Sequence, residues 1–166
     1  MFKIKFGGNI MIKQLLAGIG FSLIILTASA QEKAFILEKN NLFYTQNHIL
    51  CDGLIKENYP SGAIKAEYSF VKGLPEGTST IYFENGNVKE IRNFNNGLKH
   101  GEWLTFDEKG NKTAIAYYHH GLKDSTWMVW DENGIKRYEF SYNKGQKAGT
   151  WLMYDEKGAI AQEQKH

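Results

Sequence analysis

The stretch GEWLTFDEKGNKTAIAYYHHG, residues 101–121, contains the pattern that decides the fold. Residues 102–107 include Trp, Leu, Thr and Phe, which suit a pleated strand. A polar turn follows at residues 108–111, with Gly110 at a place where a positive φ is easily adopted. Residues 112–118 have the composition of a second strand. This unit is therefore expected to be a β-hairpin followed by a short connector.

The same pattern recurs with a period of 24 residues on both sides of this stretch. Glycine columns run through Gly73, Gly97, Gly121 and Gly145, through Gly77, Gly101 and Gly149 with Ser125 in the remaining slot, and through Gly62, Gly86, Gly110, Gly134 and Gly158. Aromatic columns run through Tyr82, Phe106, Trp130 and Tyr154, through Phe70, Phe94, Tyr118 and Tyr142, and through Trp103, Trp127 and Trp151 with Ser79 in the earlier slot. A fixed period of this length is typical of repeat proteins.

The period predicts five hairpins, with strands near 54–59/64–70, 78–83/88–94, 102–107/112–118, 126–131/136–142 and 150–155/160–164. Because every connection is short, strands that are neighbours in sequence should pair antiparallel. No helical periodicity after residue 31 provides a cover for either face. The predicted fold class is therefore all-β: an elongated, twisted, single-layer antiparallel sheet of five tandem 24-residue hairpins.

Side-chain parity assigns the residues of each hairpin to faces. Leu104 and Phe106 share one face of the first strand, and Tyr118 lies on the second strand with the same two-residue alternation. We therefore expect the columns that contain these residues to stack from hairpin to hairpin. Trp103 has the opposite parity. Either it packs on the other face, or a glycine-linked bend rotates it inward.

Most of the periodic residues are interpreted as structural. The turn glycines and the two ring columns that begin at Tyr82 and Phe70 build the repeat and its core. Trp103, Trp127 and Trp151 are the candidate partner-binding residues, because their parity leaves them outside the Leu/Phe stack.

The first 30 residues have the three parts of a secretory signal peptide. Lys3, Lys5 and Lys13 precede an apolar run at residues 15–27, and small residues follow at 28–30, which predicts cleavage before Gln31. The run is short for a membrane span, although an uncleaved anchor is the alternative. Translation from Met11 would give a more ordinary signal. We therefore expect an exported protein, periplasmic or extracellular, with a cap segment at residues 31–52 and the repeat domain at residues 53–166.

The net charge and the cysteine content reduce the number of functions to be expected. The first 30 residues contain three lysines and no acidic residue, so their removal changes the formal charge from +2 to −1. No nucleic-acid partner is expected at that charge. Cys51 is the only cysteine, so no internal disulfide is expected. Strand geometry places His48 and Cys51 on opposite faces, and we interpret Cys51 as a small buried residue.

No reaction centre is predicted. The Asp-Glu pairs that begin at Asp107, Asp131 and Asp155 lie at repeat boundaries and are interpreted as turn residues. His100, His119 and His120 form the only histidine cluster in the sequence, but adjacent residues of a strand point to opposite faces, which favours a solvated connector over a metal site. The chain is therefore predicted to be no enzyme and to bind no metal or cofactor.

The spacing of Gly, Trp, aromatic and acidic residues in segments 101–121, 125–145 and 149–158 resembles the MORN repeat, in its bacterial variant. The resemblance covers residues 53–164 and implies a sheet of hairpin repeats. Bacterial proteins of this layout include YwqK-type antitoxins, which neutralise a toxin partner, so the resemblance also implies binding. An exported chain departs from that setting, because it does not meet cytoplasmic targets.

Three functions follow from these observations. The first is an exported, non-catalytic module that binds or scaffolds another protein, antitoxin-like by resemblance. The second is a glycan- or cell-envelope-binding module that uses the Trp column. The third is a lipid-surface binder, which the charge of −1 disfavours at anionic membranes. No transmembrane segment is expected after cleavage.

Overall fold

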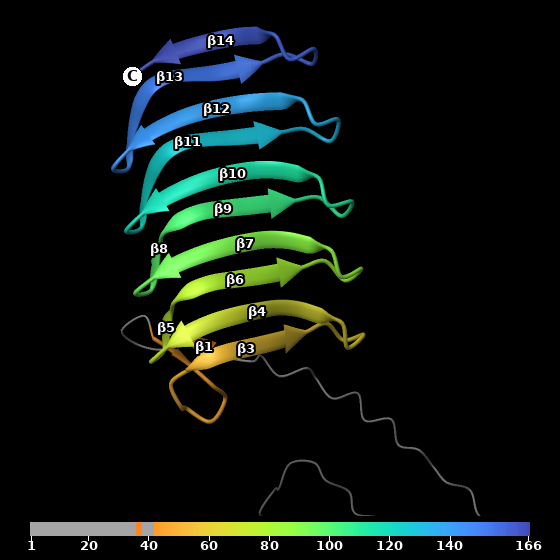
Figure 1. The fold of residues 1–166 in the computed structure, drawn as a ribbon, viewed down its shortest axis with the longest axis vertical. Coiled ribbons are helices and arrows are strands. Elements are labelled where there is room, and N and C mark those ends of the chain that lie inside the picture. Colours follow the sequence, from red (N-terminus) through yellow and green to blue (C-terminus); the bar gives the residue numbers. More distant parts are fainter. Residues whose placement is uncertain (1–35, 38–41) are drawn as a thin grey trace, which may run out of the picture. The chain divides into compact units, whose positions relative to one another are not determined.

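The computed structural model describes residues 36–37 and 42–166, and every regular element in those ranges is a β-strand. The strands form one 12-stranded sheet and a separate two-stranded sheet (Figure 1). The predicted signal peptide, residues 31–35 and 38–41 of the predicted cap, and the start at Met1 or Met11 lie outside the described residues. None of the described elements is helical, so this part of the chain contains no helix long and apolar enough to cross a bilayer.

Five long hairpins follow one another along the large sheet. Their strands are β3 (Gly53–Asn58) with β4 (Ile64–Val71), β6 (Gly77–Tyr82) with β7 (Val88–Asn95), β9 (Gly101–Phe106) with β10 (Lys112–His119), β11 (Leu122–Trp130) with β12 (Lys136–Asn143), and β13 (Gln146–Tyr154) with β14 (Ile160–Lys165). The short strands β5 (Leu74–Pro75) and β8 (Leu98–Lys99) pair with β4 and β7. The ten long strands are ordered in space as in sequence, which confirms the predicted all-β hairpin sheet.

Two kinds of turn make this regularity. At the hairpin tips, the Asp107 amide donates to the carbonyl of Asn111 at 2.9 Å, and the other four hairpins repeat the bond at the equivalent residues. At the connectors, two consecutive residues have positive φ, as in His120 (47°) and Gly121 (83°). Consecutive positive φ values are the backbone of a type I′ turn, whose twist matches that of the strands it joins. Both turns therefore connect neighbouring strands directly.

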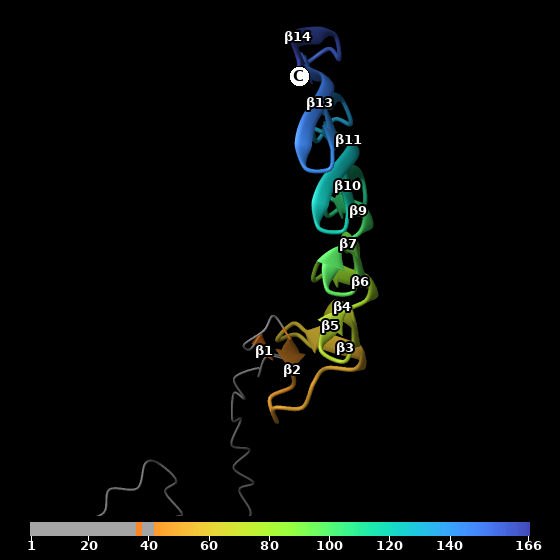
Figure 2. The ribbon, with the colours of Figure 1, turned by 90° about the vertical axis from the view of Figure 1, so that its left-hand side faces the viewer.

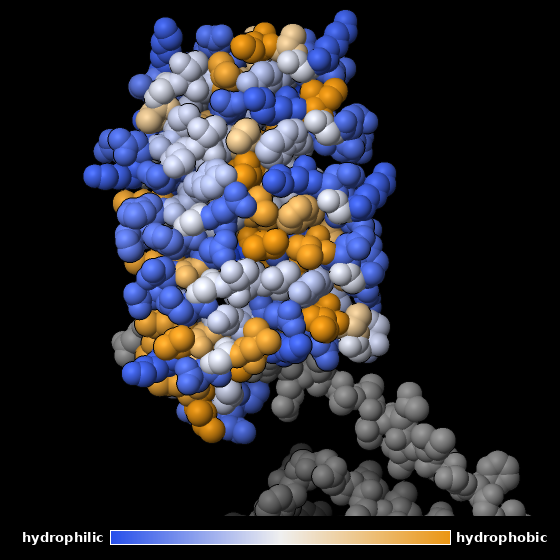
Figure 3. All heavy atoms as spheres, in the orientation of Figure 1, coloured by the Kyte–Doolittle hydropathy of each residue, from blue (hydrophilic) through white to orange (hydrophobic). Residues whose placement is uncertain are grey.

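The strand register places Trp103 and Leu104 on opposite faces. Trp103 lies opposite Ala116, and Leu104 lies opposite Ile115. Of the two arrangements left open by parity, the first is therefore correct: the Trp column packs on the other face of the sheet. The Leu104 face contains an apolar cross-strand row of Ile91, Leu104, Ile115 and Met128. Figure 3 shows apolar side chains gathered along the middle of the face in view and at its lower left, among polar side chains.

The most buried residues gather near the first hairpin. Cys51, Ala66 and Phe70 are 0%, 1% and 3% exposed, respectively. The small sheet of β1 (Ile36–Leu37) and β2 (Phe43–Tyr44) lies beside this end of the large sheet (Figure 2), and Phe43 packs on Phe70 with ring centroids 5.3 Å apart. Elsewhere the large sheet is a single layer, so most of its side chains are half-exposed.

Candidate functional site: an aromatic ladder and the pocket at Ser79

An aromatic ladder runs along the Trp face of the sheet. Successive ring centroids lie 4.7–5.4 Å apart in the order Phe94, Trp103, Tyr118, Trp127, Tyr142, Trp151 and His166. The rings are mostly tilted or edge-to-face, which are favourable arrangements for aromatic pairs. The Trp residues of the first strands thus alternate with rings of the second strands, and the ladder joins neighbouring repeats.

Each Trp of the ladder is also held by polar contacts. The indole Nε1–H donates to the backbone carbonyl ten residues earlier, at 2.9 Å for Trp103 and 3.0 Å for both Trp127 and Trp151. A lysine ammonium lies 4.2–4.5 Å from each ring centroid, which is the geometry of a cation–π contact. The Trp side chains proposed for partner binding are therefore half-buried and fully engaged within the sheet.

A β-bulge explains why the predicted stack was placed on the wrong face. Extending the pairing of Phe106 with Lys112 would place Leu104 on the same face as Tyr118. The register shifts by one residue between Lys112 and Ala114, so that Trp103 shares its face with Tyr118 instead. A one-residue shift transfers every following side chain to the other face. Similar shifts recur near the tips of the other four hairpins.

The ladder is interrupted at Ser79, which occupies the Trp position of the second hairpin. Ser79 is 2% exposed and lies at a pocket of about 400 Å³. The pocket is lined by Phe43, Tyr68, Phe70, Pro75, Ser79, Arg92, Phe94 and Gly97. Phe70 and Phe94 are the two rings between which the period would place an indole. The sequence contains a signal for this pocket, because Ser79 breaks the Trp column.

Polar groups lie at the pocket and on the strands beside it. Arg92 lies opposite Ser79 in the sheet, and its Nη2 is 2.6 Å from Glu90 Oε2. The Ser69 carbonyl, ten residues before Ser79, accepts the Glu76 amide at 3.0 Å. A carbonyl oxygen has two lone pairs, so this one retains capacity for a second donor. Burial raises the pKa of Tyr68, with the nearby Glu57 carboxylate adding to the effect, so its hydroxyl is neutral at neutral pH.

The structure brings His100, His119 and His120 together, which corrects the expectation that neighbouring histidines point to opposite faces. The rings of His119 and His120 have centroids 4.4 Å apart, and His100 lies 5.3 and 5.1 Å from them. The strand rule fails because β10 ends at His119 and His120 belongs to the turn, where its positive φ redirects the side chain.

The acidic turn residues act within their own turns. Asp107 Oδ1 accepts the amides of Lys109 and Asn111 at 2.9 and 2.8 Å, and Asp131 and Asp155 repeat the pattern. Hydrogen bonds from the Asn111 side chain and from the turn amides hold the pKa of Asp107 below its ordinary value. Burial raises the pKa of the Cys51 thiol, so this group is protonated at neutral pH.

Two of the five hairpins have a recognisable relationship to known proteins. Residues 75–96 and 99–120 match the MORN repeat variant. These MORN repeats contain β6 with β7 and β9 with β10, and the predicted resemblance is confirmed for them. The other three hairpins share the 24-residue period and the turns of the MORN repeats. A search of curated proteins found no match to the chain.

Proposed function

We propose that this chain is a non-catalytic repeat protein that binds another protein, and that the pocket at Ser79 receives an aromatic side chain of the partner. MORN repeats are commonly protein- or membrane-binding modules. The observation that carries the proposal is the interruption of the ladder. At this position of the column, a small residue replaces the indole that Trp103, Trp127 and Trp151 supply in the later hairpins.

The neighbouring positions indicate what fits the pocket. Trp127 lies between Tyr118 and Tyr142 and donates its indole N–H to a carbonyl ten residues earlier. Phe70 and Phe94 line the pocket as the flanking rings. The Ser69 carbonyl, ten residues before Ser79, is at the position equivalent to the acceptor of each Trp indole. An incoming Trp or Tyr would therefore bury its ring between two rings and donate its polar hydrogen, as anchor residues of protein interfaces do.

A non-catalytic role is supported by how the polar side chains are used. The carboxylates of Asp107, Asp131 and Asp155 accept backbone amides in their turns. The Cys51 thiol is buried and protonated, which suits packing and disfavours nucleophilic attack. These carboxylates and this thiol, which could otherwise act as acids, bases or nucleophiles, are therefore engaged in local structure. The histidine cluster is the exception.

We also propose that the protein is exported and that its role is antitoxin-like. The basic start, apolar run and small residues of segment 1–30 support export to the periplasm or the cell exterior. The partner would then be an envelope or secreted protein, and a toxin among these would make the chain an antitoxin of the YwqK type. The glycan-binding and lipid-surface alternatives stay predictions. The engagement of the Trp rings in the ladder gives the glycan alternative less support.

The test fills the pocket from within. Ser79→Trp should extend the ladder by one ring, and Phe140 opposite Trp127 shows that a large residue is accommodated across from a ladder Trp. Peptides selected on the wild-type chain from a displayed random library should be enriched in Trp, Tyr or Phe. Ser79→Trp should abolish their binding, as measured by fluorescence polarisation, while the circular dichroism spectrum stays unchanged.

Thr78→Trp is the matched control, because it adds the same indole at the adjacent, exposed position on the opposite face. This variant should bind the selected peptides as the wild type does. Selected peptides without aromatic residues, or peptides that bind Ser79→Trp as tightly as the wild type, would contradict the pocket as the binding site.

A further inference from the structure

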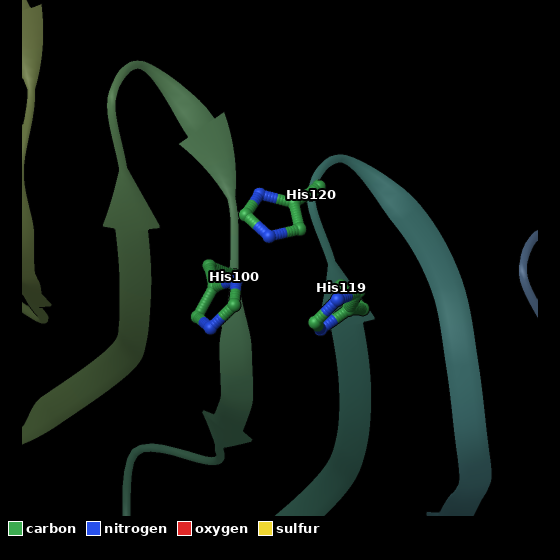
Figure 4. A group of neighbouring side chains, drawn as sticks. All are labelled: His100, His119 and His120. Carbon is green, nitrogen blue, oxygen red and sulfur yellow. The ribbon is translucent and has the colours of Figure 1, made fainter.

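Three histidine rings gather at the connector side of the sheet (Figure 4). His100 lies between β8 and β9, His119 ends β10, and His120 is in the following turn. One candidate ligand nitrogen from each ring lies within 4.8 Å of the others. His119 and His120 are exposed, whereas His100 is half-buried. Two adjacent repeats therefore contribute to one cluster.

The equivalent connectors of the other repeats have a different arrangement. A carboxylate occupies the position of His100 in three of them, and it accepts the amide of the first turn residue: Asp52 from Lys72 at 3.0 Å, Glu76 from Asn96 at 2.7 Å, and Asp124 from Lys144 at 3.3 Å. The side chain at this position thus normally caps the turn. His100 departs from that role.

His100 Nδ1 is buried and has no hydrogen-bond partner among the described residues. A buried polar atom without a partner is uncommon and costs free energy, unless water or an ion satisfies it. Coordination of a cation by this lone pair would remove the cost. The loss of the usual cap and the unpaired nitrogen occur at the same residue that completes the histidine cluster.

From this geometry we infer that His100, His119 and His120 bind a divalent transition-metal ion of the zinc class. Neutral imidazole is a preferred ligand of Zn²⁺, Ni²⁺ and Cu²⁺. Zn–N bonds of about 2.0–2.1 Å in a tetrahedral site require nitrogen atoms about 3.3 Å apart. The candidate nitrogen atoms now lie within 4.8 Å of one another. Rotation of the exposed His119 and His120 rings can bring them to the shorter distance. Three protein ligands leave a fourth position for water or for a group of another molecule.

The test uses the purified chain and Zn²⁺ alone. Calorimetric titration after chelator treatment should show a single Zn²⁺ bound per chain, and Co²⁺ should give the visible absorption of a tetrahedral site. The double variant His119→Asn/His120→Asn recreates the Asn95–Asn96–Gly97 turn of the preceding repeat, so its fold is expected to persist. It should lose Zn²⁺ binding, and His119→Asn alone should bind more than about tenfold more weakly.

His48→Asn is the matched control, because His48 also has a positive φ (56°), which asparagine tolerates, and lies outside the cluster. This variant should bind Zn²⁺ as the wild type does. The inference is overturned if the wild-type chain binds no Zn²⁺ at millimolar concentration, or if the folded double variant retains the wild-type affinity and stoichiometry.

Discussion

Ser125 lies in a backbone conformation that its neighbours in the repeat reserve for glycine. Its φ is 55°, close to the 68° of Gly101 and the 63° of Gly149 at equivalent positions. A residue with a Cβ atom is strained in this left-handed region, whereas glycine is not. The Ser125 hydroxyl bonds only the adjacent Asp124 carboxylate at the exposed surface, and that bond offsets little of the strain.

Replacing Ser125 with glycine should therefore stabilise the protein by about 1 kcal/mol. Urea denaturation followed by circular dichroism measures the change in the free energy of unfolding. The reverse change, Gly149→Ser, places the same strain in the next repeat and should destabilise by a similar amount. Equal stability of all three chains would show that the backbone relaxes at this position.

At the scale of elements, the ladder makes each Trp a link between two hairpins. Trp127 lies on β11, its indole N–H bonds the Tyr117 carbonyl of β10, and its ring contacts Tyr142 of β12. The Lys123 ammonium lies 4.5 Å from the same ring centroid. Ring packing involves far more surface than the cation contact, so the ring should dominate the energy of the link.

Trp127→Ala should accordingly lower the free energy of unfolding by about 3 kcal/mol. Lys123→Met keeps most of the aliphatic stem and removes only the charge, so its loss should be about 0.5 kcal/mol. Thermal and urea denaturation of the two variants provide the comparison. A loss for Trp127→Ala as small as that for Lys123→Met would return Trp127 to the role of a partner-binding residue.

The bounds of the strands were predictable from the sequence, whereas the face of the sheet on which each side chain lies was not. Gly110 and its equivalents mark the tips, so the predicted strands agree with the structure within one residue, except that β11 and β13 begin four residues earlier. The side of the sheet on which Tyr118 lies depends on a bulge near Lys112, and no residue type in the hairpin indicates that bulge. The convergence of the three histidine rings was not predicted, because strand parity was applied to His120, which is a turn residue.

At the scale of the whole molecule, the sheet is a linear series of hairpins. Each of the ten long strands pairs, among the long strands, only with those before and after it in sequence, and β14 forms one edge with every residue exposed. Glu163 and Lys165 on that strand discourage pairing with other sheets. Stability in such proteins is approximately a sum over units and the interfaces between neighbours.

Removing the last hairpin, residues 146–166, should therefore leave the remaining hairpins folded with reduced stability. The β-sheet signal in circular dichroism should persist, and the unfolding midpoint in urea should fall. Removing residues 1–76 instead deletes the buried Cys51, Ala66 and Phe70 and should reduce stability further. Complete loss of the β signal after either deletion would show that the sheet folds as a single cooperative unit.

The 24-residue period gives the sheet a constant increment of length. Two strands at about 4.8 Å each add roughly 10 Å with every hairpin. Because a new unit would contact only the units on either side, duplication of one hairpin extends the protein without requiring compensating changes at a distance. A lineage can thus adjust the reach of such a protein in fixed steps, while a single altered unit, such as the one with Ser79, specialises alone.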